Sequence, residues 1–107
     1  EVDAVVNPTN GSFSLTGEVG TALKKAGSSA FEEEVKNLAK DKSPLEVGDA
    51  AICPGHNFPA KFVIHVHSPS ASQKDALEKI ETAVKNILVM ADEKNLKSIA
   101  LPSIGSG

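Results

Sequence analysis

The residues Thr16-Gly17-Glu18-Val19-Gly20 form the stretch of this sequence that is best suited to bind an anion. They lie between a short apolar run that ends in Asn7-Pro8-Thr9-Asn10 and a helical pattern that begins near Val19. Glycines at a strand-to-helix junction let backbone N–H groups approach a ligand, and the helix N-terminus adds a partial positive charge. This arrangement suits a phosphate-binding loop, although such glycines by themselves more often form plain turns.

Two further segments rich in small polar residues follow apolar runs. Ser68 comes after Phe62–Val66, and Ser103-Ile104-Gly105-Ser106-Gly107 comes after Ser98–Leu101. If these two runs and Val2–Val6 are parallel neighbours, all three segments line one crevice at the carboxyl edge of the sheet. Two facing glycine loops can hold a pyrophosphate through main-chain N–H groups, without a basic surface. A nucleotide diphosphate fits this chemistry.

The strands that would position these loops are four apolar runs. They are Val2–Val6, Glu46–Cys53, Phe62–Val66 and Ser98–Leu101. The third run is apolar on both faces, which predicts a central strand. Pro8 is expected to end the first strand. Asn7 and Asn10 then lie at its carboxyl end, where they either face a ligand or fix the turn through backbone hydrogen bonds.

Two helical patterns separate these strands. Apolar residues recur at helical spacing from Val19 to about Lys40, but Gly27-Ser28-Ser29 interrupts them and Ser29 with Glu32 forms a capping box. We expect two consecutive helices or one kinked helix there. A second amphipathic helix, capped by Ser72 with Asp75 and ending before Asn95, is predicted from the stripe Leu77, Ile80, Val84, Ile87, Leu88 and Ala91. The alternation indicates an α/β domain with helices on both faces of the sheet.

Length and composition fit one small globular domain or part of one. The chain has 107 residues, of which 40% are hydrophobic and 23% charged, with no apolar run of membrane-spanning length. A net charge of −3 argues against a nucleic-acid backbone as the main ligand. The single cysteine, Cys53, favours a reducing compartment. Because apolar runs lie close to both ends, we expect further parts of the domain on both sides.

Four motifs, in this order, resemble the macrodomain family. They are Asp3–Asn10, Thr16–Gly20, Val63-Ile64-His65 with Ser68-Pro69, and Leu101–Gly107. The resemblance implies a three-layer α/β/α fold with a central mixed sheet, truncated at both ends, in which residues 1–107 form a single partial macrodomain. It also implies binding of ADP-ribose, free or as the terminal unit of poly-ADP-ribose, with no metal and no cofactor besides this ligand.

The resemblance also assigns site residues. The first phosphate loop of the family matches Thr16, Gly17, Glu18, Val19 and Gly20, and the second loop matches Ser103, Ile104, Gly105, Ser106 and Gly107. Ser68 matches a serine that lines the ligand, and Asn10 matches an asparagine near the distal ribose. The adenine-binding aspartate of the family lies upstream of Glu1, and the aromatic residue that covers the distal ribose lies beyond Gly107.

A narrower resemblance, to the macrodomain of the macro-histones, rests on Gly17–Gly20, Pro44–Val47, Pro59–His65 and Leu96–Ala100. It implies a nuclear chromatin reader of ADP-ribosylated proteins, attached to the nucleosome by a histone fold outside this sequence, with no membrane partner. One splice form of these histones binds ADP-ribose and another does not. Gly17–Gly20 resembles the binding form, whereas Ser12–Thr16 departs from it.

The alternatives to a reader are an ADP-ribosyl hydrolase and a ligand-free chromatin scaffold. Hydrolytic macrodomains carry an acidic residue after the glycine run, and that position is Gly20 here. Glu18 matches a position whose backbone faces the phosphates, and a general base must lie within hydrogen-bond reach of its proton. We therefore assign no catalytic residue and favour a reader.

Three other side chains with chemical potential are interpreted as structural. Cys53 is expected to be a small buried strand residue, because no partner that would lower its pKa is evident. His65 and His67 should point to one face of the central strand. With no third ligand evident, a structural pair is favoured over a metal site.

Overall fold

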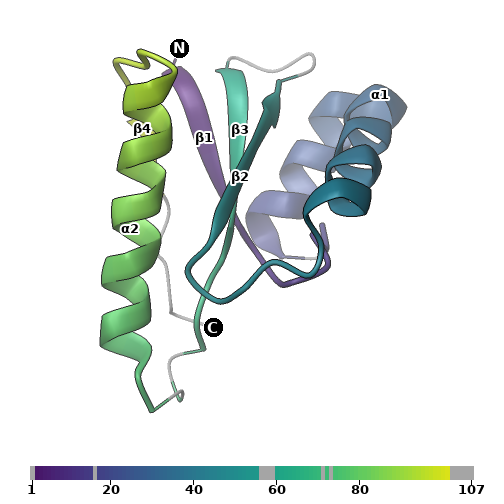
Figure 1. Cartoon of the computed structure of the whole chain (residues 1–107). Coiled ribbons are helices and arrows are strands. Elements are labelled where there is room, and N and C mark those ends of the chain that lie inside the picture. Colours follow the sequence, from purple (N-terminus) through teal and green to yellow (C-terminus); the bar gives the residue numbers. More distant parts are fainter. Residues whose placement is uncertain (1, 16, 56–59, 71, 73, 102–107) are drawn as a thin grey trace.

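The computed structural model describes residues 2–15, 17–55, 60–70, 72 and 74–101, which form a mixed sheet between two helices (Figure 1). The elements are β1 (Val2–Thr9), α1 (Glu18–Lys42), β2 (Ala50–Pro54), β3 (Ala60–His67), α2 (Ala76–Glu93) and β4 (Ile99–Ala100). Among the described residues, no helix has the length and apolar character needed to cross a membrane.

The strand order across the sheet is β2-β3-β1-β4. β1 pairs in parallel with β3 on one side and with β4 on the other, while β2 is antiparallel to β3. The three strands that were expected to be parallel neighbours are therefore neighbours, and β3 is central as predicted. Parallel neighbours carry their loops at the same carboxyl edge, which is where ligands bind in α/β sheets.

Each face of the sheet carries one helix, so the three-layer architecture is confirmed (Figure 1). Successive strand residues point to opposite faces, and in β3 Val63 packs on the α1 side while Ile64 packs on the α2 side. The buried cluster on the α1 side consists of Phe13, Leu23, Phe31, Val35, Leu45, Ala51, Cys53 and Val63. The buried cluster on the α2 side consists of Ala4, Val6, Ile64, Val66, Ala83 and Ile87.

Pro8 does not end β1, so that expectation was wrong. The strand continues to Thr9, and Pro8 is in register with Val66 of β3. Proline has no backbone N–H and fits only where no ladder hydrogen bond is needed from its nitrogen. The described pairing of β1 with β4 involves only Ala4 and Val5, so β1 has no described partner on that side at Pro8.

Helix α1 is continuous, so the expectation of two separate helices was wrong. Residues 27–29 are helical, and Ser29 therefore does not cap a second helix. Figure 1 shows that α1 changes direction along its length, which agrees with the alternative of one kinked helix. Burial of Leu23, Phe31 and Val35 in the core outweighs the weak helix propensity of the interrupting residues.

Helix α2 is the amphipathic helix that was expected, but its buried stripe is different. Ala83, Ile87 and Ala91 are buried, whereas Leu77 is 79% exposed and Leu88 57% exposed. The helix begins after Asp75, which makes no side-chain cap hydrogen bond. The expected cap at Ser72 is therefore not formed.

Asn95 ends α2 as predicted. Its φ of 56° is in the left-handed region. The Leu96 N–H donates to the Ala91 carbonyl at 2.9 Å, and the Asn95 N–H donates to the Asp92 carbonyl at 3.0 Å. These two bonds make a Schellman motif, which satisfies the last carbonyls of the helix.

Strand β2 is shorter than expected, because it begins at Ala50 and not at Glu46. The Asp49 N–H donates to the Glu46 carbonyl at 2.9 Å, which closes a turn before the strand. Gly48, within this turn, has a φ of 94°, a conformation that favours glycine.

Candidate functional site

The carboxyl ends of β1 and β3 lie side by side. The last pair in register is Thr9 with His67, and the Ser68 N–H donates to the Thr9 carbonyl at 3.2 Å. The structure therefore brings Asn10 and Ser68, two of the predicted ligand residues, to neighbouring positions. Residues 102–107, which contain the predicted second loop, lie outside the described residues.

The loop between β1 and α1 is organised by the side chain of Asn10. We call residues 10–17 the β1–α1 loop, of which residue 16 lies outside the described residues. The Oδ1 atom of Asn10 accepts hydrogen bonds from the Ser12 N–H, the Ser12 hydroxyl and the Ser14 N–H, each at 3.1 Å. Two roles were considered for this side chain, contact with a ligand and fixing of the turn. In the structure, its oxygen fixes the turn.

Phe13 anchors the same loop in the core. It has a φ of 61° and is 3% exposed. Its ring meets the imidazole of His65 edge-on, with 5.8 Å between ring centroids. An exposed loop is thus tied to the central strand by a buried aromatic contact.

The two glycines at the start of α1 have different surroundings. Gly17 is the N-cap, with a φ of −72° and a ψ of 175°, an extended conformation that any residue can adopt. Among the described residues, a Cβ at Gly17 would meet no atom within 4 Å, whereas a Cβ at Gly20 would lie 2.9 Å from Leu15 Cα. The packing of the chain explains the glycine at position 20. Nothing in the described structure requires glycine at position 17, and the space beside it is open.

Helix α1 presents backbone donors at this point. Its N-cap residue, Gly17, makes no side-chain cap hydrogen bond, and the first N–H groups of a helix have no partner within the helix. The predicted residue Glu18 is the first helical residue, Val19 is half-buried against the core on the α1 side, and Gly20 is buried. The partial positive charge of the helix end favours an anion beside Gly17.

Three buried polar side chains form a hydrogen-bonded chain behind the site. Asn7 Nδ2 donates to His65 Nδ1 at 3.0 Å, and His65 Nε2 lies 3.3 Å from Cys53 Sγ. An amide nitrogen can only donate, so Nδ1 accepts, and Nε2 carries the proton and donates to the sulfur. Asn7 and His65 are both 0% exposed, and within the described residues Asn7 Oδ1 has no partner.

The hydrogen-bonded side chains of Asn7, His65 and Cys53 are uncharged near pH 7 and do not provide a nucleophile. Burial lowers the pKa of His65 to about 4. Burial, together with the charge of Glu34, raises the pKa of Cys53 to about 12. A nucleophilic thiol needs a lowered pKa, so the interpretation of Cys53 as a buried structural residue is confirmed.

His67 is tied to the backbone of the segment after α1. Its Nδ1 donates to the Leu45 carbonyl at 2.6 Å. His65 and His67 therefore both bond to groups of the protein. Across the described part of the chain, no three His, Cys, Asp or Glu side chains are grouped so that they could hold a metal ion.

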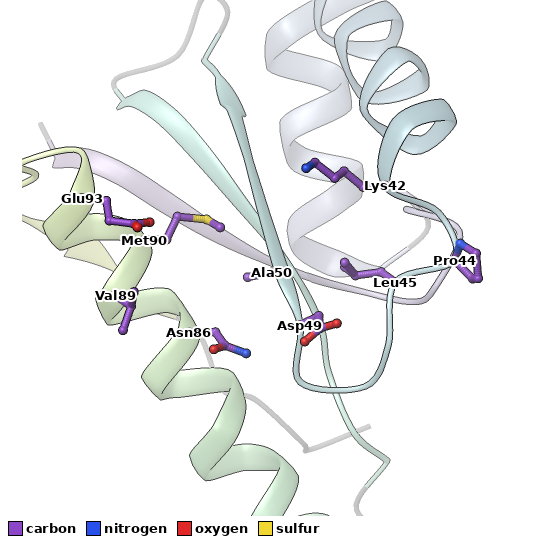
Figure 2. Close-up of a pocket in the computed structure, with 9 residues that line it drawn as sticks. All are labelled: Lys42, Pro44, Leu45, Asp49, Ala50, Asn86, Val89, Met90 and Glu93. Atoms are coloured by element: carbon purple, nitrogen blue, oxygen red, sulfur yellow. The ribbon is translucent and has the colours of Figure 1, made fainter.

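Two hollows of the described structure are lined by residues other than the predicted ligand residues. A hollow of about 360 Å³ lies between α2, β2 and the segment after α1. Figure 2 shows the side chains that line it. It is lined by Lys42, Pro44, Leu45, Asp49, Ala50, Asn86, Val89, Met90 and Glu93. The other hollow, of about 220 Å³, lies between the β1–α1 loop and α1 and is lined by Ser12, Phe13, Leu15, Lys24, Glu32, Val35, Lys36 and Ala39.

Comparison with known proteins places the chain in a family. The profile of the Macro domain family matches residues 6–107, and the chain belongs to this family. It is 45% identical over 98% of its length to Histone macroH2A1.1 of Capsaspora owczarzaki, of which it covers 29%. It is 38% identical over 100% of its length to a macro domain-containing protein of Caldanaerobacter subterraneus, of which it covers 62%. The chain thus spans less than two thirds of these relatives.

Solved structures agree with this assignment. The chain superposes on a mutant of the Oceanobacillus iheyensis macrodomain determined with ADPR, with a TM-score of 0.90 and 26% identity over 99% of this chain and 60% of that one. The same macrodomain determined with ADP gives a TM-score of 0.88 and 28% identity over 99% of this chain and 58% of that one. The expected macrodomain fold is therefore confirmed.

Proposed function

We propose that this macrodomain is a non-catalytic reader that binds ADP-ribose, with the diphosphate beside the N-terminus of α1. The observation that carries the proposal is Gly17, the N-cap of α1, where a Cβ would meet no atom of the described residues within 4 Å. A diphosphate can approach this backbone because position 17 has no side chain. Similar folds determined with ADPR and with ADP support the choice of ligand.

The remaining contacts follow from the edge of the sheet. Asn10 and Ser68 follow β1 and β3 at this edge. In the proposed complex, Asn10 lies near the distal ribose and Ser68 lines the ligand. Thr16 and the segment Ser103–Gly107 complete the proposed binding set by matching the two loops of the family. In this arrangement the diphosphate is held by backbone N–H groups of two loops, which is consistent with a net charge of −3.

Gly20 supports a reader over a hydrolase. A hydrolase needs a general base within hydrogen-bond reach of the attacking water, directly or through one more water. Position 20 carries no carboxylate, and a side chain there would meet the backbone of Leu15 at 2.9 Å. The neutral pair of His65 and Cys53 is buried and offers no substitute.

The similarity to a macro-histone supports a role in chromatin. Because the chain is 45% identical to Histone macroH2A1.1, we propose that it is a macro-histone-like module that reads ADP-ribosylated proteins or the terminal unit of poly-ADP-ribose in the nucleus. A histone fold outside this sequence would attach it to the nucleosome. Other relatives of similar length coverage are bacterial and archaeal, so pull-down of ADP-ribosylated nucleosomes by the full-length protein tests this part separately.

Calorimetric titration of the full-length protein with ADP-ribose tests binding. One saturable site is expected. Flat heats at high micromolar ligand would contradict the proposal and favour the ligand-free scaffold. A second assay tests the absence of catalysis, by incubating the protein with a mono-ADP-ribosylated substrate protein. Release of free ADP-ribose at a catalytic rate would overturn the reader assignment in favour of a hydrolase.

A further inference from the structure

We infer that His65 is a positioning residue, which joins the β1–α1 loop to α1 from within the core and so fixes the backbone at Gly17, where the diphosphate binds. This inference rests on the proposed function and deepens it. His65 lies in β3 and is 0% exposed, so it acts on the site only through the side chains that it contacts. The loop and the helix meet at Gly17, and a side chain that contacts both can set how they meet.

The imidazole of His65 contacts two phenylalanine rings, one from each of these segments. The ring of Phe13, in the β1–α1 loop, meets it edge-on, with 5.8 Å between centroids and an interplanar angle of 69°. The ring of Phe31, in α1, stacks on it, with 6.1 Å between centroids and an angle of 26°. Edge-on and stacked arrangements are the favourable ones for aromatic pairs. One side chain of the sheet therefore holds both the loop and the helix.

Partners at both ring nitrogens fix the orientation of the imidazole. Asn7 Nδ2 donates to Nδ1 at 3.0 Å, and Nε2 lies 3.3 Å from Cys53 Sγ. These partners belong to β1 and β2, the strands on either side of β3. The ring cannot rotate without leaving buried polar atoms unpaired, which costs free energy. His65 therefore presents a fixed surface to the two phenylalanine rings.

The loop depends on this surface because Phe13 has an unfavourable backbone conformation. Its φ of 61° lies in the left-handed region, which a phenylalanine keeps only where its surroundings support it. Burial of the Phe13 ring against His65 contributes this support. Leu15, two residues further along, contacts the helix backbone, since its Cα would be 2.9 Å from a Cβ at Gly20. The position of the Phe13 ring thus determines how the loop approaches the start of α1.

Calorimetric titration of the full-length protein with ADP-ribose tests the inference. His65→Gln removes the ring, whereas Ile64→Val removes one methyl group from the preceding residue of β3, which is buried on the α2 side. Because the loop and the helix are no longer held together, the ADP-ribose affinity of folded His65→Gln should fall roughly three- to tenfold. Ile64→Val, the control for a general loss of stability, should bind like the wild type. Wild-type affinity in His65→Gln, or an equal loss in both variants, would overturn the inference.

Phe13→Leu shows whether His65 acts through the loop. This variant removes the ring of the loop and leaves the imidazole in place. If the two rings act as one contact, the double variant should bind with about the affinity of His65→Gln alone. Losses that multiply in the double variant would show independent effects and overturn the inference. If His65→Gln does not fold, Phe31→Leu replaces it in both comparisons with the same expectations, because it breaks the contact from the helix side.

Hydrogen exchange of the ligand-free protein gives a readout that does not depend on binding. In His65→Gln, exchange should become faster at the amides of Ser12 and Ser14 in the loop and at Thr21, whose N–H donates to the Gly17 carbonyl at 2.8 Å. The amides of α2, on the other face of the sheet, are the reference. An increase of the same size in α2 would show a general loss of stability and overturn the inference. Absence of ADP-ribose binding by the wild type, by contrast, would contradict the proposed function alone.

Discussion

Leu15 lies against Gly20 so closely that a Cβ at position 20 would be 2.9 Å from Leu15 Cα and 3.0 Å from its carbonyl carbon. Both partners are backbone, so neither can move aside by a change of rotamer. The backbone of the loop therefore fills the space that a side chain at position 20 would need. This is the position at which hydrolytic macrodomains are expected to carry an acid. This contact links the fold of the β1–α1 loop to the glycine at position 20, on which the proposed reader function relies.

Gly20→Ala should lower the free energy of unfolding by about 1–3 kcal/mol, because the new methyl group forces the loop away from α1. Gly17→Ser is the matched control, since its conformation suits any residue and serine is a favoured N-cap. Urea unfolding of both variants measures the difference. Equal stabilities for the two variants would contradict the packing assigned to Gly20.

His65 should make the protein less stable in acid. Its folded pKa of about 4 is below the ordinary value of 6.5 because burial disfavours the charged imidazolium. The unfolded chain therefore binds more protons than the folded chain between these two pH values. The free energy of unfolding should be highest, as far as His65 is concerned, above pH 6.5 and should decrease as the pH falls towards 4. The loss should reach about 3 kcal/mol.

Urea titrations at several pH values in this window measure the effect. In His65→Gln, which has no imidazole, the decrease between the same pH values should be smaller by most of that amount. An unchanged acid dependence in this variant would show that other groups are responsible.

Cys53 should resist thiol reagents in the folded protein. It is 4% exposed, and its pKa is raised to about 12, so little thiolate exists at pH 8. We expect labelling by a disulfide reagent at least about 100-fold slower in the native state than in denaturant. Since Cys53 is the only cysteine, the signal is unambiguous. Similar rates in both states would mean that the thiol is accessible in the native state.

Asn95 offers a test of the end of α2. Its φ of 56° favours a residue without a Cβ. Asn95→Gly should therefore keep or slightly raise the melting temperature, while Asn95→Ala should cost about 1 kcal/mol. Thermal unfolding followed by circular dichroism compares the two variants. A more stable alanine variant would contradict the Schellman motif.

Much of the fold could be predicted from the sequence because two elements have strong apolar patterns. β3 is apolar on both faces and α2 has a long helical period, and both are found where they were expected. Local signals failed where tertiary packing opposed them. Pro8 is retained in β1 by its pairing with β3, and Gly27 is retained in α1 because Leu23 and Phe31, about one turn before and after it, are buried.

The neighbouring positions of Asn10 and Ser68 could be predicted, since parallel strands end at one edge. The chain of Asn7, His65 and Cys53 could not, because Asn7 and His65 are 58 positions apart and His65 and Cys53 are 12 apart. One signal was present. Period-two alternation places Asn7 on the same face as Val5, but only if β1 continues beyond Val6 to Asn7.

The most direct test of the account compares Gly17→Glu with Gly17→Ser by calorimetric titration of the full-length protein with ADP-ribose. A Cβ at position 17 would meet no described atom within 4 Å, so we expect both variants to fold. The account predicts that the wild type binds at one site and that glutamate at position 17 abolishes binding, because its carboxylate takes the place of the phosphates and repels them. Binding by Gly17→Glu with the affinity of the wild type would contradict the central claim that the diphosphate lies beside Gly17.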